Sequence, residues 1–145
     1  MKKSDDGKYF VWNKGEVEAL SSHFSTKEFA CKCINDDCVE QRAAVALIEK
    51  LQALRISFQL PISVTSGFRC AKHQNALRDG GLQTTTGQST HELGHAADIK
   101  PKLADRGTIK RLSELAANHF KAIGTAASFV HVDIRADKKR RWKYD

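Results

Sequence analysis

Apolar residues recur along the chain with two different spacings, which predict where helices and strands lie. From about Val39 to Phe58 they return every three or four residues, the spacing of one face of an α-helix. This face consists of Ala44, Leu47, Ile48, Leu51, Leu54 and Phe58. A second amphipathic helix is predicted over residues 105–120, DRGTIKRLSELAANHF. A short helix is predicted over residues 71–79, stopped by Gly80 and Gly81 and followed by a polar loop from Leu82 to Thr90.

The segment HFSTKEF, residues 23–29, has the signature of a helix start. Ser25 and Glu28 have the spacing of a capping box, in which each side chain accepts a hydrogen bond from the backbone of the other. Phe24 and Phe29 have the spacing of a hydrophobic staple. We therefore expect a helix that begins directly after Ser25.

Three other segments predict strands. Ile62–Ser66 alternates and is rich in β-branched residues, and HAADIK, residues 95–100, reads as a short buried strand closed by Pro101. In SFVHVDIR, residues 128–135, alternation directs valines to one face and polar side chains to the other. The apolar set is Val130, Val132 and Ile134, and the opposite set is Phe129, His131 and Asp133.

These helices and strands do not follow a regular βαβ order, which favours an α+β fold. We expect a small antiparallel sheet with helices packed on one face and a functional cleft on the other. Without a repeat or a linker rich in Pro, Gly or Ser, residues 1–145 are expected to form one domain with a basic C-terminal tail, residues 136–145.

Net charge and composition limit the chemical classes of partner that the protein can bind. The formal net charge of +7 favours anionic partners, whereas no apolar run is long enough to insert into a membrane. The N-terminal residues lack the apolar core of a signal peptide, so we expect synthesis in the cytoplasm. The tail, with Trp142 and Tyr144 as stacking platforms, allows a nucleic-acid binder as a disfavoured alternative.

The segment HELGH, residues 91–95, matches the H-E-x-x-H zinc signature of metalloproteases, which requires a helix. A polar loop precedes His91, Gly94 interrupts the segment and Pro101 follows soon after, so this interpretation is disfavoured. Alternation instead predicts that Asp98 and His131 lie on one sheet face. With His91 they form a His, Asp, His set that suits a catalytic zinc ion, and a solvated polar face is the alternative.

Several separated motifs together resemble the zinc D-alanyl-D-alanine carboxypeptidase family. They are Ser66-Gly67-Phe68-Arg69, Asn75, Gly80-Gly81, the frame S-x-H-x-x-G-x-A-x-D from Ser89 to Asp98, and FVHVD from Phe129 to Asp133. That family includes VanX-type dipeptidases, phage L-alanyl-D-glutamate endolysins and murein endopeptidases, and it shares its fold with the hedgehog signalling domain. The N-terminal HFSTKEFACKC is similar to the start of phage and prophage members.

The resemblance implies zinc bound by His91, Asp98 and His131, with Arg69 contacting substrate and Ser89 lining the substrate cleft. The alternatives are a surface salt bridge for Arg69 and a loop cap for Ser89. Many relatives carry an acidic general base three residues before the last ligand, where this chain has Ser128. We therefore assign the base to Asp133, with orientation of the His131 ring as its alternative role. Glu92 is a less favoured candidate for the general base.

The function implied is hydrolysis of peptide bonds in peptidoglycan by a monomeric zinc peptidase at the bacterial cell wall. Without a signal peptide, it would reach the wall by a phage lysis route or as part of a virion. A catalytically silent peptidoglycan-binding module is the alternative, and the bond that is cut stays open.

Four cysteines remain outside this assignment: Cys31, Cys33, Cys38 and Cys70. The C-x-C-x4-C spacing of the first three is not that of a usual zinc knuckle. We therefore expect reduced cysteines, with a second, structural zinc ion and a disulfide as the alternatives.

Overall fold

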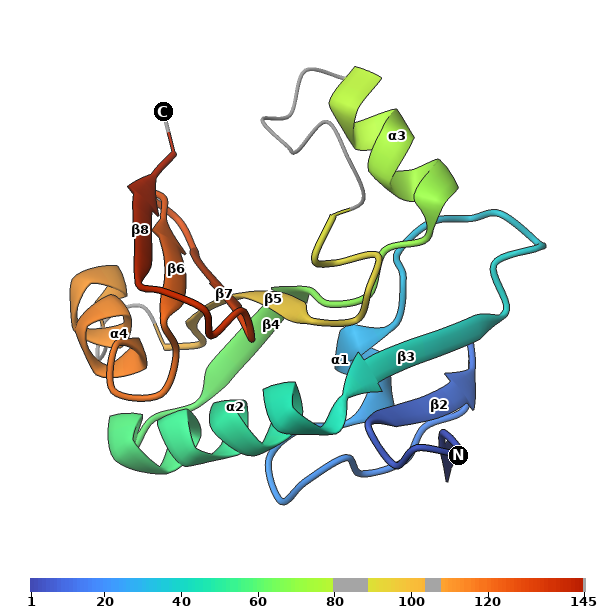
Figure 1. Ribbon diagram of the computed structural model, residues 1–145, viewed down its shortest axis with the longest axis horizontal. Coiled ribbons are helices and arrows are strands. Elements are labelled where there is room, and N and C mark those ends of the chain that lie inside the picture. The colour runs from blue at the N-terminus through green and yellow to red at the C-terminus, as the bar shows by residue number, and fades with distance from the viewer. Residues whose placement is uncertain (80–88, 104–107, 145) are drawn as a thin grey trace.

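The computed structural model describes residues 1–79, 89–103 and 108–144, which form two β-sheets and four helices (Figure 1). The smaller sheet has the order β1 (Lys2–Lys3), β2 (Tyr9–Asn13), β3 (Glu40–Ala44). The larger sheet has the order β4 (Ile62–Ser66), β5 (Ala96–Pro101), β7 (Val130–Asp133), β6 (Ala122–Thr125), β8 (Arg140–Lys143). The helices are α1 (Thr26–Phe29), α2 (Val45–Phe58), α3 (Ala71–Asp79) and α4 (Ile109–Ala116). This confirms the α+β fold class.

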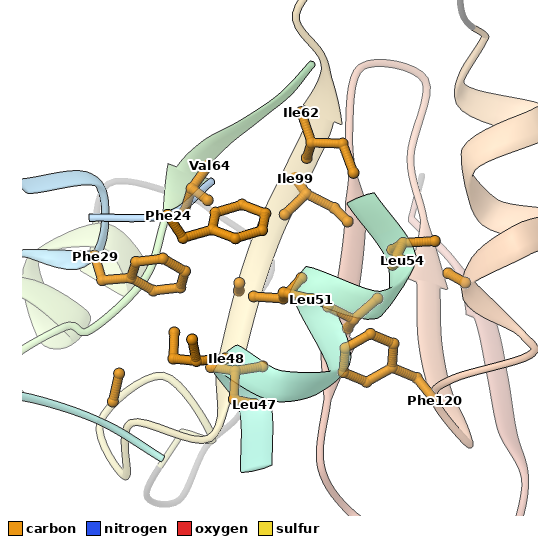
Figure 2. Packing of buried hydrophobic residues seen from close by; sticks show 14 of the residues in the cluster. Phe24, Phe29, Leu47, Ile48, Leu51, Leu54, Ile62, Val64, Ile99 and Phe120 are labelled. Carbon is orange, nitrogen blue, oxygen red and sulfur yellow. The ribbon is translucent and has the colours of Figure 1, made fainter. Parts of the chain in front are cut away.

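The core lies on one face of the larger sheet, where α2 packs with α4 beside it (Figure 2). Leu47, Leu51 and Leu54 of α2 have no exposed surface, and they meet Ile99 of β5 and Val130 of β7. Each such buried side chain stabilises the fold by about 1.5–3 kcal/mol relative to an exposed one. The opposite face of β5 and β7 is therefore free to carry polar chemistry.

The sheet differs from the prediction at one edge. β4, β5, β7 and β6 are antiparallel neighbours, but β8 pairs in parallel with β6, with Ala122 opposite Arg140 and Thr125 opposite Lys143. The predicted basic tail thus contains a paired edge strand. Its charged residues suit an edge, where alternate side chains face solvent.

The long predicted helix begins later than expected, because Glu40–Ala44 forms β3 and pairs with β2. Gln41 and Ala43 alternate inward on this strand and are buried. The helix then ends at Phe58, where Gln59 adopts a left-handed conformation (φ 63°) and donates its backbone N–H to Arg55.

Helix starts follow the local sequence only in part. α1 begins after Ser25 as predicted, but the Ser25 side chain makes no capping hydrogen bond, so this half of the predicted capping box is wrong. Phe24 and Phe29 do meet edge to face, at 6.0 Å between ring centroids. The second amphipathic helix begins at Ile109 behind Thr108, whose side chain accepts from the Arg111 N–H, and it ends at Ala116 rather than Phe120.

The short helix, now α3, and the strands β4, β5 and β7 lie where the sequence predicts them. Gly80, Gly81 and most of the predicted loop from Leu82 to Thr90 lie outside the described residues. Within the described ranges, no helix is both long and apolar enough to cross a membrane.

Candidate metal centre

Three buried side chains meet on the sheet face opposite α2: His91, Asp98 and His131. Asp98 of β5 and His131 of β7 are directly paired residues of adjacent antiparallel strands, which places their side chains together on one face. His91 lies in the turn that leads into β5. Sheet pairing and one turn therefore bring together residues that are up to 40 positions apart.

The distances within this cluster fit a tetrahedral zinc site. Asp98 Oδ1 lies 3.3 Å from His91 Nε2 and 3.0 Å from His131 Nδ1. Ligand atoms at ordinary zinc bond lengths in tetrahedral geometry are about 3.4 Å apart. The donor set of two imidazoles and one carboxylate leaves a fourth position for water or substrate, as catalytic zinc sites require.

The turn holds the His91 ring with its Nε2 atom facing the cluster. His91 Nδ1–H donates a hydrogen bond to the carbonyl oxygen of Gly67, and the two heavy atoms are 2.7 Å apart. The backbone N–H of His91 donates to Ser89 Oγ at 3.1 Å. This contact supports the alternative role of Ser89 as a loop cap, and its substrate role stays a prediction.

The second oxygen of Asp98 is held by Arg69. Arg69 Nη2 lies 3.0 Å from Asp98 Oδ2, and both side chains are buried. Arg69 Nε also donates to Ser66 Oγ at 2.8 Å. The ion pair is therefore buried, unlike the surface salt bridge considered above, and it leaves Asp98 Oδ1 to face the two histidines.

His131 lies between two carboxylates. Its Nδ1 atom faces Asp98, and its Nε2 atom lies 2.9 Å from Asp133 Oδ2. Asp133 has no exposed surface, and Arg135 clamps it with Nη2 2.8 Å from Oδ2 and Nε 2.9 Å from Oδ1. When Nε2–H donates to Asp133, the Nδ1 lone pair points to the candidate metal position, as in carboxylate–histidine–zinc arrangements.

The electrostatics set the protonation states of the ligands. Burial lowers the pKa of His91 below its ordinary value. Burial opposes ionisation of Asp98, but His91 and His131 outweigh it and lower the pKa of Asp98 well below the usual range. Burial likewise opposes protonation of His131, but hydrogen bonds to Asp133 and Asp98 raise its pKa above the ordinary value. Metal binding at His131 therefore competes with protonation of the ring, and the competition becomes stronger as the pH falls.

The H-E-x-x-H interpretation of residues 91–95 is excluded by the backbone. Residues 90–94 form turns, Gly94 has a positive φ of 74°, and strand β5 begins at Ala96. The His95 ring stacks on Tyr9 at 5.7 Å and its Nε2 atom hydrogen-bonds to the Tyr9 hydroxyl. Among the described residues, neither His95 nor Glu92 belongs to the cluster with His91.

Two supporting residues escaped the sequence interpretation. Arg135 follows Asp133 by two positions, so strand alternation could have suggested that they share a face. Trp142 of β8 packs its ring 5.3 Å from the His131 ring, whereas the sequence suggested only a stacking platform for nucleic acid. The parallel pairing of β8 that puts Trp142 there has no evident signal in the sequence.

Comparison with known proteins agrees with the geometry. A family model described as Peptidase M15 matches residues 22–133, which span α1, α3, the three predicted ligands and Asp133. No curated protein matches the chain.

Proposed function

Because the chain belongs to the Peptidase M15 family, whose peptidases are zinc-dependent, we propose that it hydrolyses peptide bonds in the stem peptides or cross-links of peptidoglycan. The observation that carries the proposal is the buried cluster of His91, Asp98 and His131 with tetrahedral spacing. A zinc ion held there would supply a water of lowered pKa and would polarise the scissile carbonyl.

The protein itself contributes by directing one lone pair from each of the three candidate ligands at the candidate metal position. The Gly67 carbonyl fixes the tautomer of His91, Arg69 fixes the rotamer of Asp98, and Asp133 fixes His131. Supporting partners of this kind change metal affinity or activity by about 10- to 100-fold. Contacts within the protein thus orient all three candidate ligands.

The role of Asp133 as general base stays a prediction, and its contacts favour the alternative of orienting His131. Hydrogen bonds from His131 and Arg135 outweigh the effect of burial and lower the pKa of Asp133 below the usual range. Both of its oxygens already accept hydrogen bonds from these two side chains. A proton acceptor would need an oxygen directed at the substrate instead.

Arg69 as a substrate contact is likewise a proposal. Its guanidinium is buried and donates to Ser66, Gln74 and Asp98. These contacts support a positioning role toward Asp98. A substrate carboxylate would have to reach the N–H groups of Arg69 that face away from Asp98.

The net charge of +7 supports an anionic polymer such as the bacterial cell wall as the place of action. We propose that the protein reaches the wall by a phage lysis route or as part of a virion. The protein is proposed to act as a monomer.

The test is digestion of purified peptidoglycan, followed by mass spectrometry of the released muropeptides, which also identifies the bond that is cut. His131→Ala should lose both bound zinc and release of new amino groups. His95→Ala is the matched control and should keep both, because His95 contacts Tyr9 rather than the cluster. Full activity of His131→Ala would overturn the proposal.

A catalytically silent peptidoglycan-binding module is the second candidate. Ser128 stands where many relatives place an acidic base, and both oxygens of Asp133 are engaged. Protein that holds zinc in this site and sediments with peptidoglycan, yet releases no amino groups, would favour the module over the enzyme.

A further inference from the structure

All four cysteines of the chain gather in a second cluster, separate from that of His91, Asp98 and His131. Cys31, Cys33 and Cys38 lie in the segment between α1 and β3, and Cys70 directly precedes α3. Their sulfur atoms all lie within 4.8 Å of one another, and no disulfide joins them. Folding therefore adds a fourth sulfur from a segment that is remote in sequence.

The sulfur spacing fits one tetrahedral ion. Cys70 Sγ lies 3.8 Å from Cys31 Sγ and 3.7 Å from Cys33 Sγ. Four thiolates at the usual zinc–sulfur bond length would be about 3.8 Å apart. The sulfurs already occupy the separation that a bound ion would impose.

The surroundings supply the hydrogen bonds that thiolates need. The backbone N–H groups of Cys70 and His73 donate to Cys31 Sγ and Cys70 Sγ, each at 3.4 Å. Gln41 Nε2 donates to Cys38 Sγ at 3.4 Å, and Lys14 Nζ lies 3.5 Å from Cys33 Sγ. Every one of the four sulfurs thus accepts from an N–H donor, and one donor is a cation. Four thiolates around a divalent ion carry net negative charge, which such donors stabilise.

We propose that Cys31, Cys33, Cys38 and Cys70 bind a structural zinc ion. Four cysteine ligands close the coordination shell, which is typical of structural rather than catalytic zinc. Cys33 and Cys38 also border a surface hollow lined by Lys14 and Asn35, which gives the ion a way in. The C-x-C-x4-C spacing of the first three cysteines did not indicate this site, whose fourth ligand lies 32 residues beyond the third.

A zinc ion bound by the cysteines would help to position the His91 cluster through the residues just before Cys70. In this segment the Gly67 carbonyl accepts from His91 Nδ1, and the Arg69 N–H donates to the His91 carbonyl at 3.2 Å. The Arg69 side chain holds Asp98. A zinc ion at Cys70 would therefore anchor the segment that positions two of the three candidate ligands.

Metal analysis of the full chain, purified without chelator, tests the proposal. The wild-type protein should hold two zinc ions per chain, one of which is lost in Cys70→Ser and the other in His131→Ala. Ile34→Ser is the matched control in the same loop and should keep both, because Ile34 is 98% exposed. One ion in the wild type, absent from His131→Ala, would overturn the proposal.

A second measurement begins from the wild-type protein and does not depend on how well Cys70→Ser folds. Wild-type protein reconstituted with cobalt(II) should show intense visible bands and thiolate-to-cobalt charge transfer in the near ultraviolet, and these should persist in His131→Ala. Their absence would overturn the site. So would a disulfide among the four cysteines in unreduced protein, or four thiols that react at once with a thiol reagent before zinc is removed. Iron instead of zinc in the site would overturn the assignment of the metal.

Discussion

At the scale of the residue, the candidate centre depends on two carboxylates that flank one imidazole. Asp98 shares a candidate ion with His131, whereas Asp133 binds the far nitrogen of the same ring and is itself held by Arg135. The two aspartates therefore have different expected effects when their charge is removed.

Asp133→Asn tests the orienting role. An amide keeps the shape but weakens the hold on His131, so zinc affinity of the His91 site should fall by about 10-fold. The affinity can be measured by competition with a chromophoric chelator. Asp137→Asn removes an exposed ion pair with Arg140 and should leave zinc affinity unchanged. Unchanged zinc affinity in Asp133→Asn together with lost turnover would instead support Asp133 as the general base.

Asp98→Asn tests the ligand assignment directly. The neutral amide is a poor zinc ligand, and it also leaves the buried guanidinium of Arg69 without its charge partner. The variant should lose the zinc ion of this site in metal analysis, whereas His95→Ala should retain it. Zinc retained in Asp98→Asn would contradict the assignment of Asp98 as a ligand.

Gly67 is needed because the chain passes very close to α1. A Cβ atom at Gly67 would lie 2.7 Å from Phe29 Cα and 2.9 Å from its carbonyl oxygen. Since backbone atoms cannot move aside easily, Gly67→Ala should lower the free energy of unfolding by about 1–3 kcal/mol. Urea denaturation monitored by circular dichroism measures it. The three atoms nearest to a Cβ at Gly124 all belong to the Trp142 ring, the first at 2.4 Å. Because this half-buried side chain can turn aside and backbone cannot, Gly124→Ala should cost less; an equal or larger loss would contradict this explanation.

Sequence patterns singled out the three residues of the buried cluster because strand alternation and the family motifs converge on them. They missed the Gly67 carbonyl that fixes His91, because a backbone contact between segments 24 residues apart leaves no mark on residue types. The Asp98–Arg69 contact was also missed, although both residues were singled out separately. The sequence thus indicated which residues form the cluster, but not which groups hold them by hydrogen bonds and ion pairs.

At the scale of the element, long amphipathic segments were predicted and short edge strands were not. α2 was predicted because its buried apolar residues recur at helical spacing, and β7 because apolar and polar side chains alternate along it, although all four of its residues are buried. β3, by contrast, was absorbed into the predicted helix because its buried alanines fit either structure. β8 consists mainly of basic residues, which do not indicate a strand until β6 supplies a partner.

β8 contributes Trp142, whose ring packs against the His131 ring and beneath the Arg135 guanidinium. Since Trp142 is only half-buried, Trp142→Ala should lower the free energy of unfolding by about 1–2 kcal/mol, less than a fully buried aromatic residue. Lys143→Ala, at the adjacent exposed position of β8, should change it by less than about 0.5 kcal/mol. Equal effects in urea denaturation would show that the Trp142 contact contributes nothing.

At the scale of the whole molecule, the core and the candidate centre occupy opposite faces of one sheet. The helical face accounts for most of the buried apolar side chains, whereas the other face places polar groups that gain little from burial alone. Metal ions would offset that cost, so stability should depend on zinc.

Removing zinc with a chelator should therefore lower the melting temperature. A ligand at 1,000 times its Kd stabilises the folded state by about 4 kcal/mol, so the loss should be large and should reverse when zinc is restored. Thermal unfolding followed by circular dichroism at several free zinc concentrations measures this. A melting temperature that does not change with zinc would contradict the dependence.

The direct pairing of Asp98 with His131 makes the candidate centre a check on strand alignment. A slip of one residue between β5 and β7 would turn one of these side chains to the apolar face and separate the pair. An ion that needs both ligands would then bind only the correctly aligned sheet. Zinc would thereby select the native alignment from mispaired forms during folding, in addition to any chemistry that it supports afterwards.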